Sequence, residues 1–141
     1  MSVPKGLRQE SKLEVQVRVE ELVRHTVHIM ANARTFDPRY ATFHDRILDV
    51  AIGIGQDVWE ANGIYVANDA RRYEERRRLQ ERACRRLDTL LYLMTICRKL
   101  DHLRTKKYQH WVDLARDARD MARKWRDSDA RRYGHLIQGN G

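Results

Sequence analysis

Apolar residues recur at steps of three and four positions along four segments of this chain. That spacing places them on one face of an α-helix. The first segment covers residues 10 to 33, the second follows Thr42 and ends near residue 61, and the third runs from about residue 69 to residue 103. A fourth apolar stripe extends from Tyr108 to Trp125. The pattern predicts four amphipathic helices, with Thr42 as the N-cap of the second.

Helix-breaking residues separate these segments. Pro38 has no amide hydrogen and disfavours helical backbone at Asp37, so the first helix should end before it. Asn62 and Gly63 suit the end of the second helix, and a short polar turn at residues 102–106 precedes the fourth. Four such helices with short connections form an up-down-up-down four-helix bundle. We predict this all-α bundle over residues 10–127, between a flexible N-terminus at residues 1–9 and a loose, basic C-terminal tail at residues 128–141.

The apolar stripes also predict which side chains form the core. We expect the largest contributions from Leu22, Ile47, Leu87, Leu90, Met94 and Trp111. Gly53 and Gly55 lie inside the second predicted helix, where each costs about 1 kcal/mol relative to alanine. Close approach of a neighbouring helix would compensate for this cost, and a local kink is the alternative.

Composition agrees with a single helical domain. The chain has 141 residues, of which 42% are hydrophobic and 34% are charged. No uninterrupted apolar run is present, so we expect neither a signal peptide nor a membrane span, and a cytoplasmic protein. Cys84 and Cys97 lie on one predicted helix about 20 Å apart, too far for a disulfide. We interpret both as small core residues.

Positive charge is concentrated in the second half of the chain. Residues 1–66 have a net charge of −1, whereas residues 67–141 have a net charge of +9. The segment RRYEERRRLQERACRR at residues 71–86 alone contains eight arginines and three glutamates. Further basic clusters follow at residues 98–107 and 123–133. Such an asymmetry favours contact with nucleic acid or another acidic partner, although a solvated helix face is the alternative.

Helical geometry divides the arginines of this segment. At 100° per residue, Arg77, Arg78, Arg82 and Arg85 point away from the core line. Arg72 and Arg76 instead fall within about 20° of it. Because burying an unpaired guanidinium is costly, we expect the first two turns of the third helix to project beyond the core or to line a wet surface between subunits.

Motifs for metal binding and catalysis are not evident. The chain has no Glu-x-x-His pair of the kind that di-iron bundles use, and His25 and His28 have no carboxylate or thiolate beside them in the sequence. It also has no nucleophile motif and no glycine-rich phosphate loop. We therefore predict a non-enzymatic protein without a metal or cofactor.

We predict that the basic side chains bind backbone phosphates of a structured RNA, with little sequence preference. The residues assigned to this interface are Arg72, Arg76, Arg77, Arg78, Arg82, Arg85, Lys106 and Lys107. Trp111 and Trp125 lie on the fourth apolar stripe, which favours core packing over base stacking for both.

Three segments together resemble a known family: FDPRYATFHDRILDVAIGIGQDVWEAN, RLDTLLYLMTICRKL and KKYQHWVDLARDARDMARKW. The pattern is similar to the accessory variability determinant proteins of diversity-generating retroelements, over residues 12 to 128. It is also similar to their relatives encoded in intervening sequences of bacterial 23S ribosomal RNA genes. The residues that carry the resemblance are Phe36, Tyr40, Arg46, Ile47, Ala61, Asn62, Leu87, Asp88, Tyr108 and Trp125.

The resemblance implies a basic homopentameric ring of four-helix subunits. Such a ring would bind a reverse transcriptase and its template RNA, with DNA or an RNA/DNA hybrid as further ligands, and would support mutagenic cDNA synthesis. Two alternatives remain open. One is a protein of the ribosomal intervening-sequence type, and the other is a structural adaptor whose basic surface docks an acidic protein.

Overall fold

The computed structural model describes residues 5–32 and 34–137 and contains four long helices within them. These are α1 (Lys5–Met30), α2 (Ala41–Asn62), α3 (Ala70–Asp101) and α4 (Thr105–Tyr133). Two short 3-10 turns, η1 (Pro38–Tyr40) and η2 (Gly134–Leu136), precede α2 and follow α4. No strand occurs in the described residues. The predictions of an all-α class and of four helices are confirmed.

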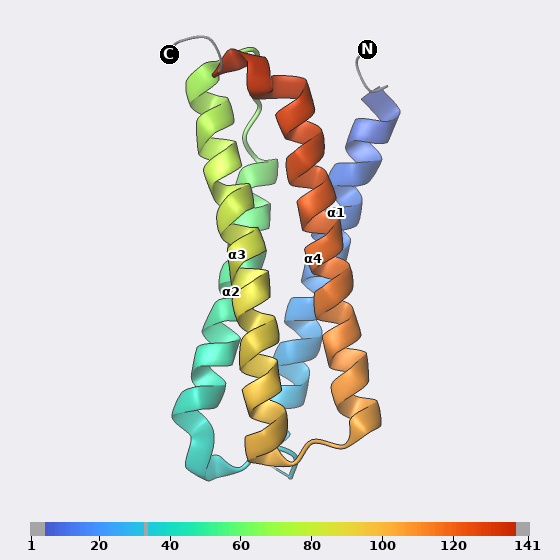
Figure 1. The fold of residues 1–141 in the computed structure, drawn as a ribbon, viewed down its shortest axis with the longest axis vertical. Helices are drawn as coiled ribbons and strands as arrows, with labels where there is room; N and C mark the ends of the chain where they lie inside the picture. The colour runs from blue at the N-terminus through green and yellow to red at the C-terminus, as the bar shows by residue number, and fades with distance from the viewer. Residues whose placement is uncertain (1–4, 33, 138–141) are drawn as a thin grey trace.

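The helices pack side by side as one elongated bundle (Figure 1). Polar contacts between helices fix their register. Asn62, at the end of α2, donates a hydrogen bond to Gln16 in the first half of α1. Arg76 in α3 pairs with Asp129 near the end of α4. Side-chain contacts therefore hold residues that are far apart in the sequence at the same level of the bundle.

All six predicted core side chains are buried, with 0% of their surface exposed. Trp111 is the largest of them, and its indole N–H donates a hydrogen bond of 3.0 Å to the hydroxyl of Thr26. That hydroxyl in turn donates to the carbonyl of Leu22 at 2.7 Å. The indole N–H thus keeps a partner inside the bundle, which removes most of the cost of burying it. The core assignment of Trp111 is confirmed, and so is that of Trp125.

The two glycines of α2 lie where other helices come close, as predicted. A Cβ at Gly53 would be 2.8 Å from the guanidinium of Arg86 in α3. A Cβ at Gly55 would be 3.3 Å from Val23 in α1. The missing side chains therefore allow α3 and α1 to approach different sides of the same helix.

The helix ends differ from the sequence prediction in several places. α2 begins at Ala41 after Tyr40, so Thr42 lies inside its first turn and the prediction of Thr42 as the N-cap is wrong. α1 begins at Lys5 rather than at residue 10, so the expected flexible N-terminus overlaps it, and residues 1–4 lie outside the described residues. α4 continues to Tyr133 and buries Asp129, so the loose tail expected from residue 128 is corrected. Residues 138–141 lie outside the described residues. Nowhere in the described chain is there a helix long and apolar enough to cross a membrane.

Candidate nucleic-acid interface

The outward face of α3 carries the exposed part of the arginine-rich segment. Five positions there follow one another at intervals of seven residues, and all five side chains are exposed: Arg71, Arg78, Arg85, Tyr92 and Lys99. Because seven residues make nearly two helical turns, successive positions lie about 10 Å apart and drift by only about 20° around the helix. We call this line of side chains the α3 ridge.

Acidic side chains lie beside the α3 ridge but do not form ion pairs with its arginines. None of the ion pairs among the described residues involves Arg71, Arg78 or Arg85. Glu74 and Glu75 are exposed one helical turn from Arg71 and Arg78 but form no ion pair among the described residues, and two further acids beside the ridge pair with other arginines. Glu81 pairs with Arg77 at 3.1 Å, and Asp88 pairs with Arg123 of α4 at 3.1 Å. The ridge therefore presents a line of exposed cations without ion-pair partners, interrupted by Tyr92, and Glu74 and Glu75 reduce the net charge beside its first turns.

Arg76 corrects the expectation that this end of α3 projects beyond the core. Its side chain points inward, as the helical geometry indicated, but it has a partner there. The guanidinium is only 10% exposed and donates through Nε to Asp129 at 2.6 Å. It also donates to the carbonyl of Ile64 at 3.2 Å and lies 5.5 Å from the ring centroid of Trp125. Arg76 ties α3 and α4 to the segment that follows α2, rather than facing a ligand.

The first turns of α3 pack against the last turns of α4 (Figure 1). Tyr73 is 1% exposed, and its ring lies 5.6 Å from that of Tyr133. Gln80, one helical turn after Arg76, donates to the same carboxylate of Asp129 at 2.7 Å. Arg72 is exposed and donates weakly to the carbonyl of Tyr65 at 3.4 Å. This end of α3 is an integral part of the bundle.

Arg82 has a structural partner that the sequence analysis missed. The carboxylate of Asp57 in α2 is only 1% exposed and accepts hydrogen bonds from Arg82 at 2.7 Å and from Arg86 at 2.9 Å. Arg86 also donates to the carbonyl of Gly53 at 3.1 Å. This hydrogen bonding to Asp57 raises the pKa of Arg82. The two arginines outnumber the acid and are 39% and 37% exposed, so a net positive charge still faces solvent.

Lys106 and Lys107 lie at the opposite end of the bundle from Arg72. Lys106 is exposed, whereas Lys107 is half-buried and donates to the hydroxyl of Thr35 at 2.9 Å. The eight predicted residues therefore do not form one patch. Four of them lie exposed on α3, two are tied into internal ion pairs, and two lie near the start of α4.

The aromatic side chains that are exposed for stacking on bases are not Trp111 and Trp125. Trp125 is 2% exposed, whereas Tyr92 on the α3 ridge is 64% exposed. Trp59 in α2 is 69% exposed and Tyr65 in the following loop is 78% exposed. The seven-residue spacing of the ridge was available in the sequence as a signal for Tyr92. The partners of Arg76 and Arg82 were not, because the carboxylates that pair with them lie at least 25 residues away in the chain.

Comparison of the chain with models of protein families, with curated proteins and with solved structures found no match.

Proposed function

We propose that this protein is a non-enzymatic accessory protein that binds the phosphate backbone of a structured RNA through the α3 ridge. The observation that carries the proposal is the line of exposed cations without acidic partners at Arg71, Arg78 and Arg85, extended by Tyr92 and Lys99. Exposed Arg72 adds charge beside it, whereas Arg77 is paired with Glu81 and Lys106 lies near the start of α4.

The chemistry of these side chains suits a backbone ligand. The planar fork of arginine can donate two hydrogen bonds to one phosphate, and its charge does not depend on pH in the physiological range. Duplex RNA is recognised mainly through shape and backbone, while an exposed tyrosine can stack on an unpaired base. We expect binding with strong salt dependence and weak sequence preference.

The partner protein and the assembly belong to the same proposal and rest on the family resemblance. We propose that the chain, as an up-down-up-down bundle, forms a homopentameric ring in a diversity-generating retroelement and holds a reverse transcriptase beside its template RNA. Exposed apolar side chains support a protein-binding role, since Ile52 and Trp59 lie seven residues apart on α2 and are 42% and 69% exposed. A monomeric mass by light scattering at micromolar concentration would refute the ring.

RNA binding is tested by changing Arg71, Arg78 and Arg85 together to glutamine. Glutamine keeps the helix propensity, so the fold should be retained while the affinity for an RNA hairpin falls. The slope of log K against log salt should become shallower by roughly one unit for each phosphate that the variant no longer binds. The matched control changes three exposed arginines on the other helices, Arg24, Arg46 and Arg116, which removes the same charge.

The comparison of the two triple variants decides the question. Weaker binding in the ridge variant alone supports a localised interface. Equal weakening in both variants would mean that only the net charge attracts RNA, and unchanged binding in both would refute the proposal. An adaptor for acidic proteins is the second candidate, because the same ridge could meet carboxylates. It would bind polyglutamate at least as tightly as the hairpin at the same ionic strength, whereas the RNA hypothesis predicts the reverse.

A further inference from the structure

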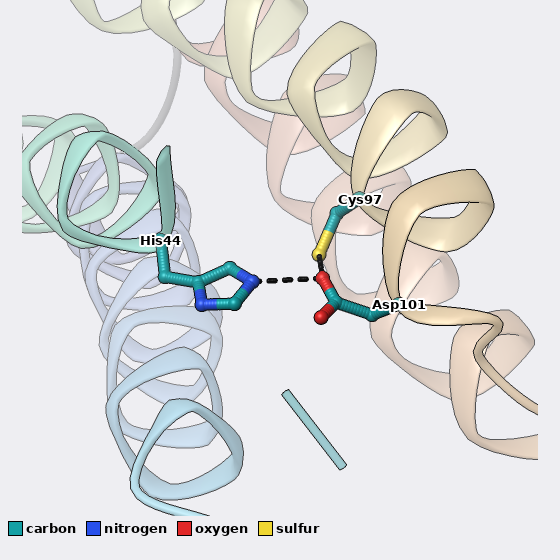
Figure 2. A group of neighbouring side chains, drawn as sticks. All are labelled: His44, Cys97 and Asp101. Atoms are coloured by element: carbon teal, nitrogen blue, oxygen red, sulfur yellow. Dashed lines mark hydrogen bonds and ion pairs between the residues drawn. The ribbon is translucent and has the colours of Figure 1, made fainter. Parts of the chain in front are cut away.

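Three side chains with metal-binding atoms converge at the end of the bundle where α2 begins and α3 ends. Figure 2 shows His44 pointing from α2 toward Cys97 and Asp101, which lie one turn apart on α3. His44 Nε2 is 2.7 Å from Asp101 Oδ2, and Cys97 Sγ is 3.3 Å from the same oxygen. All three atoms lie within 4.8 Å of one another. None of these residues belongs to the α3 ridge.

The surroundings make this a closed and rigid site. His44 and Cys97 are buried, and the Asp101 side chain is 0% exposed. The other carboxylate oxygen, Oδ1, accepts a hydrogen bond of 2.7 Å from the backbone N–H of Asp37. The ring of Phe36 lies edge-on to His44 with its centroid 5.2 Å away. Each of the three side chains is thus held by packing or by a hydrogen bond outside the group.

A purely structural lock, with Cys97 as a small core residue, is the simplest role for the group. Cys97 Sγ lies 3.3 Å from Asp101 Oδ2, the oxygen that also contacts His44. A thiol is a weak hydrogen-bond donor, and serine at this position would donate to the carboxylate better. A thiol, a carboxylate and an imidazole side by side are, in contrast, the groups that bind zinc in proteins.

We propose that His44, Cys97 and Asp101 form a binding site for Zn²⁺, with a water molecule as the fourth ligand. Tetrahedral zinc with usual bond lengths requires its nitrogen, oxygen and sulfur ligands to be about 3.4 to 3.6 Å apart. The observed separations of 2.7 and 3.3 Å differ from these values by less than about 1 Å. The third pair, His44 Nε2 and Cys97 Sγ, lies within 4.8 Å. The site is independent of the proposed RNA interface.

Charge and outer contacts favour a divalent ion here. One thiolate and one carboxylate would balance the charge of Zn²⁺, with the imidazole neutral. The buried complex would therefore have no net charge. The N–H of Asp37 would then orient the ligating carboxylate, as outer-shell donors do in other zinc sites. An open cleft of about 410 Å³ is bordered by Asp101, whose side chain is itself 0% exposed.

The proposal is tested with Co²⁺ as a spectroscopic probe, followed by displacement with Zn²⁺. We expect one equivalent of Co²⁺ to produce a thiolate-to-metal charge-transfer band and visible bands typical of four-coordination. Both should disappear when Zn²⁺ is added. Binding should release protons, because the Cys97 thiol must ionise, and Zn²⁺ should raise the thermal midpoint.

Variants separate this site from adventitious binding. Cys97→Ser and His44→Gln each remove a ligand of the metal. Removal of an outer-shell partner weakens metal binding by roughly 10- to 100-fold, and we expect each of these variants to weaken Co²⁺ binding by more than that. The matched control is Cys84→Ser, which removes the other buried cysteine of α3 and should leave the charge-transfer band intact. A band that is absent from the parent protein, or that persists in Cys97→Ser, would overturn the proposal. If Cys97→Ser fails to fold, absence of the band in folded His44→Gln and its survival in Cys84→Ser decide the matter.

Discussion

Arg76 in α3 and Asp129 in α4 form an ion pair inside the bundle, with 2.6 Å between Nε and Oδ2. The two residues are 53 positions apart in the sequence. Gln80 donates to the same oxygen of Asp129, and Arg132 lies 3.7 Å from the other one. Asp129 therefore accepts two hydrogen bonds from α3, forms an ion pair with Arg132 of its own helix, and holds the last turns of α4 against the first turns of α3.

Removal of one member of this pair should destabilise the protein strongly. In Asp129→Asn the guanidinium of Arg76 is left without its counter-charge while it remains buried, which costs about 3–5 kcal/mol in comparable pairs. Urea unfolding followed by circular dichroism measures the decrease in unfolding free energy. Arg78→Gln is the control, because Arg78 is exposed and surface changes stay within about 0.5 kcal/mol. Similar decreases in both variants would contradict the structural role of the pair.

Gly53 and Arg86 should show coupled stability effects. In the parent protein, Gly53→Ala places a methyl group 2.8 Å from the Arg86 guanidinium and pushes it away from Asp57. In an Arg86→Ala background that conflict is gone, and alanine should stabilise α2 by about 1 kcal/mol through helix propensity alone. A double-mutant cycle measured by urea unfolding checks this. Additive effects of the two substitutions would show that the close approach has no energetic consequence.

His25 should make the bundle less stable in mild acid. Burial lowers its pKa from the ordinary value of 6.5, and His110, His28 and Lys107 lower it further, against a small opposite effect of Glu21. The unfolded chain therefore binds this proton more readily than the folded one does. The free energy of unfolding should decrease as the pH falls through 6.5 toward the lower folded-state pKa.

The pH effect is isolated by comparing variants across the same range. His25→Gln removes the titrating group. The free energy of unfolding should therefore change less steeply with pH over an interval that includes 6.5. His135→Gln, at an exposed position in η2, should keep the parent slope. An unchanged slope in His25→Gln would assign the acid sensitivity to other groups.

His102 ends α3 in a backbone conformation that favours glycine. Its φ and ψ are 50° and 48°, in the left-handed region, where a side chain costs about 1–2 kcal/mol. Glycine relieves this strain but gives up more chain entropy on folding, so His102→Gly should raise the unfolding free energy by up to about 1 kcal/mol. His102→Ala should bring no gain, because alanine retains the Cβ. Thermal midpoints of the two variants, measured at one pH, distinguish these outcomes.

The helices, and the side of each that faces inward, could be predicted from the sequence. The three- and four-residue steps that include Leu22, Ile47, Leu87 and Trp111 identify buried positions because apolar surface leaves water wherever a partner helix is available. Pro38 and the Asn62–Gly63 pair likewise indicate where helices end, since their backbone preferences act locally. Helix ends that depend on distant contacts, such as the extension of α4 to Tyr133, could not be predicted in this way.

The three-dimensional packing was needed to show which charged residues face solvent and which hold the fold together. Arg76 and Arg78 are two residues apart in one basic run, yet one is buried against Asp129 and the other is exposed. His44 and Asp101 meet although 57 positions separate them. The physical reason is that burial of a charge depends on an opposite charge being brought within hydrogen-bond distance, and the packing of whole helices sets that distance.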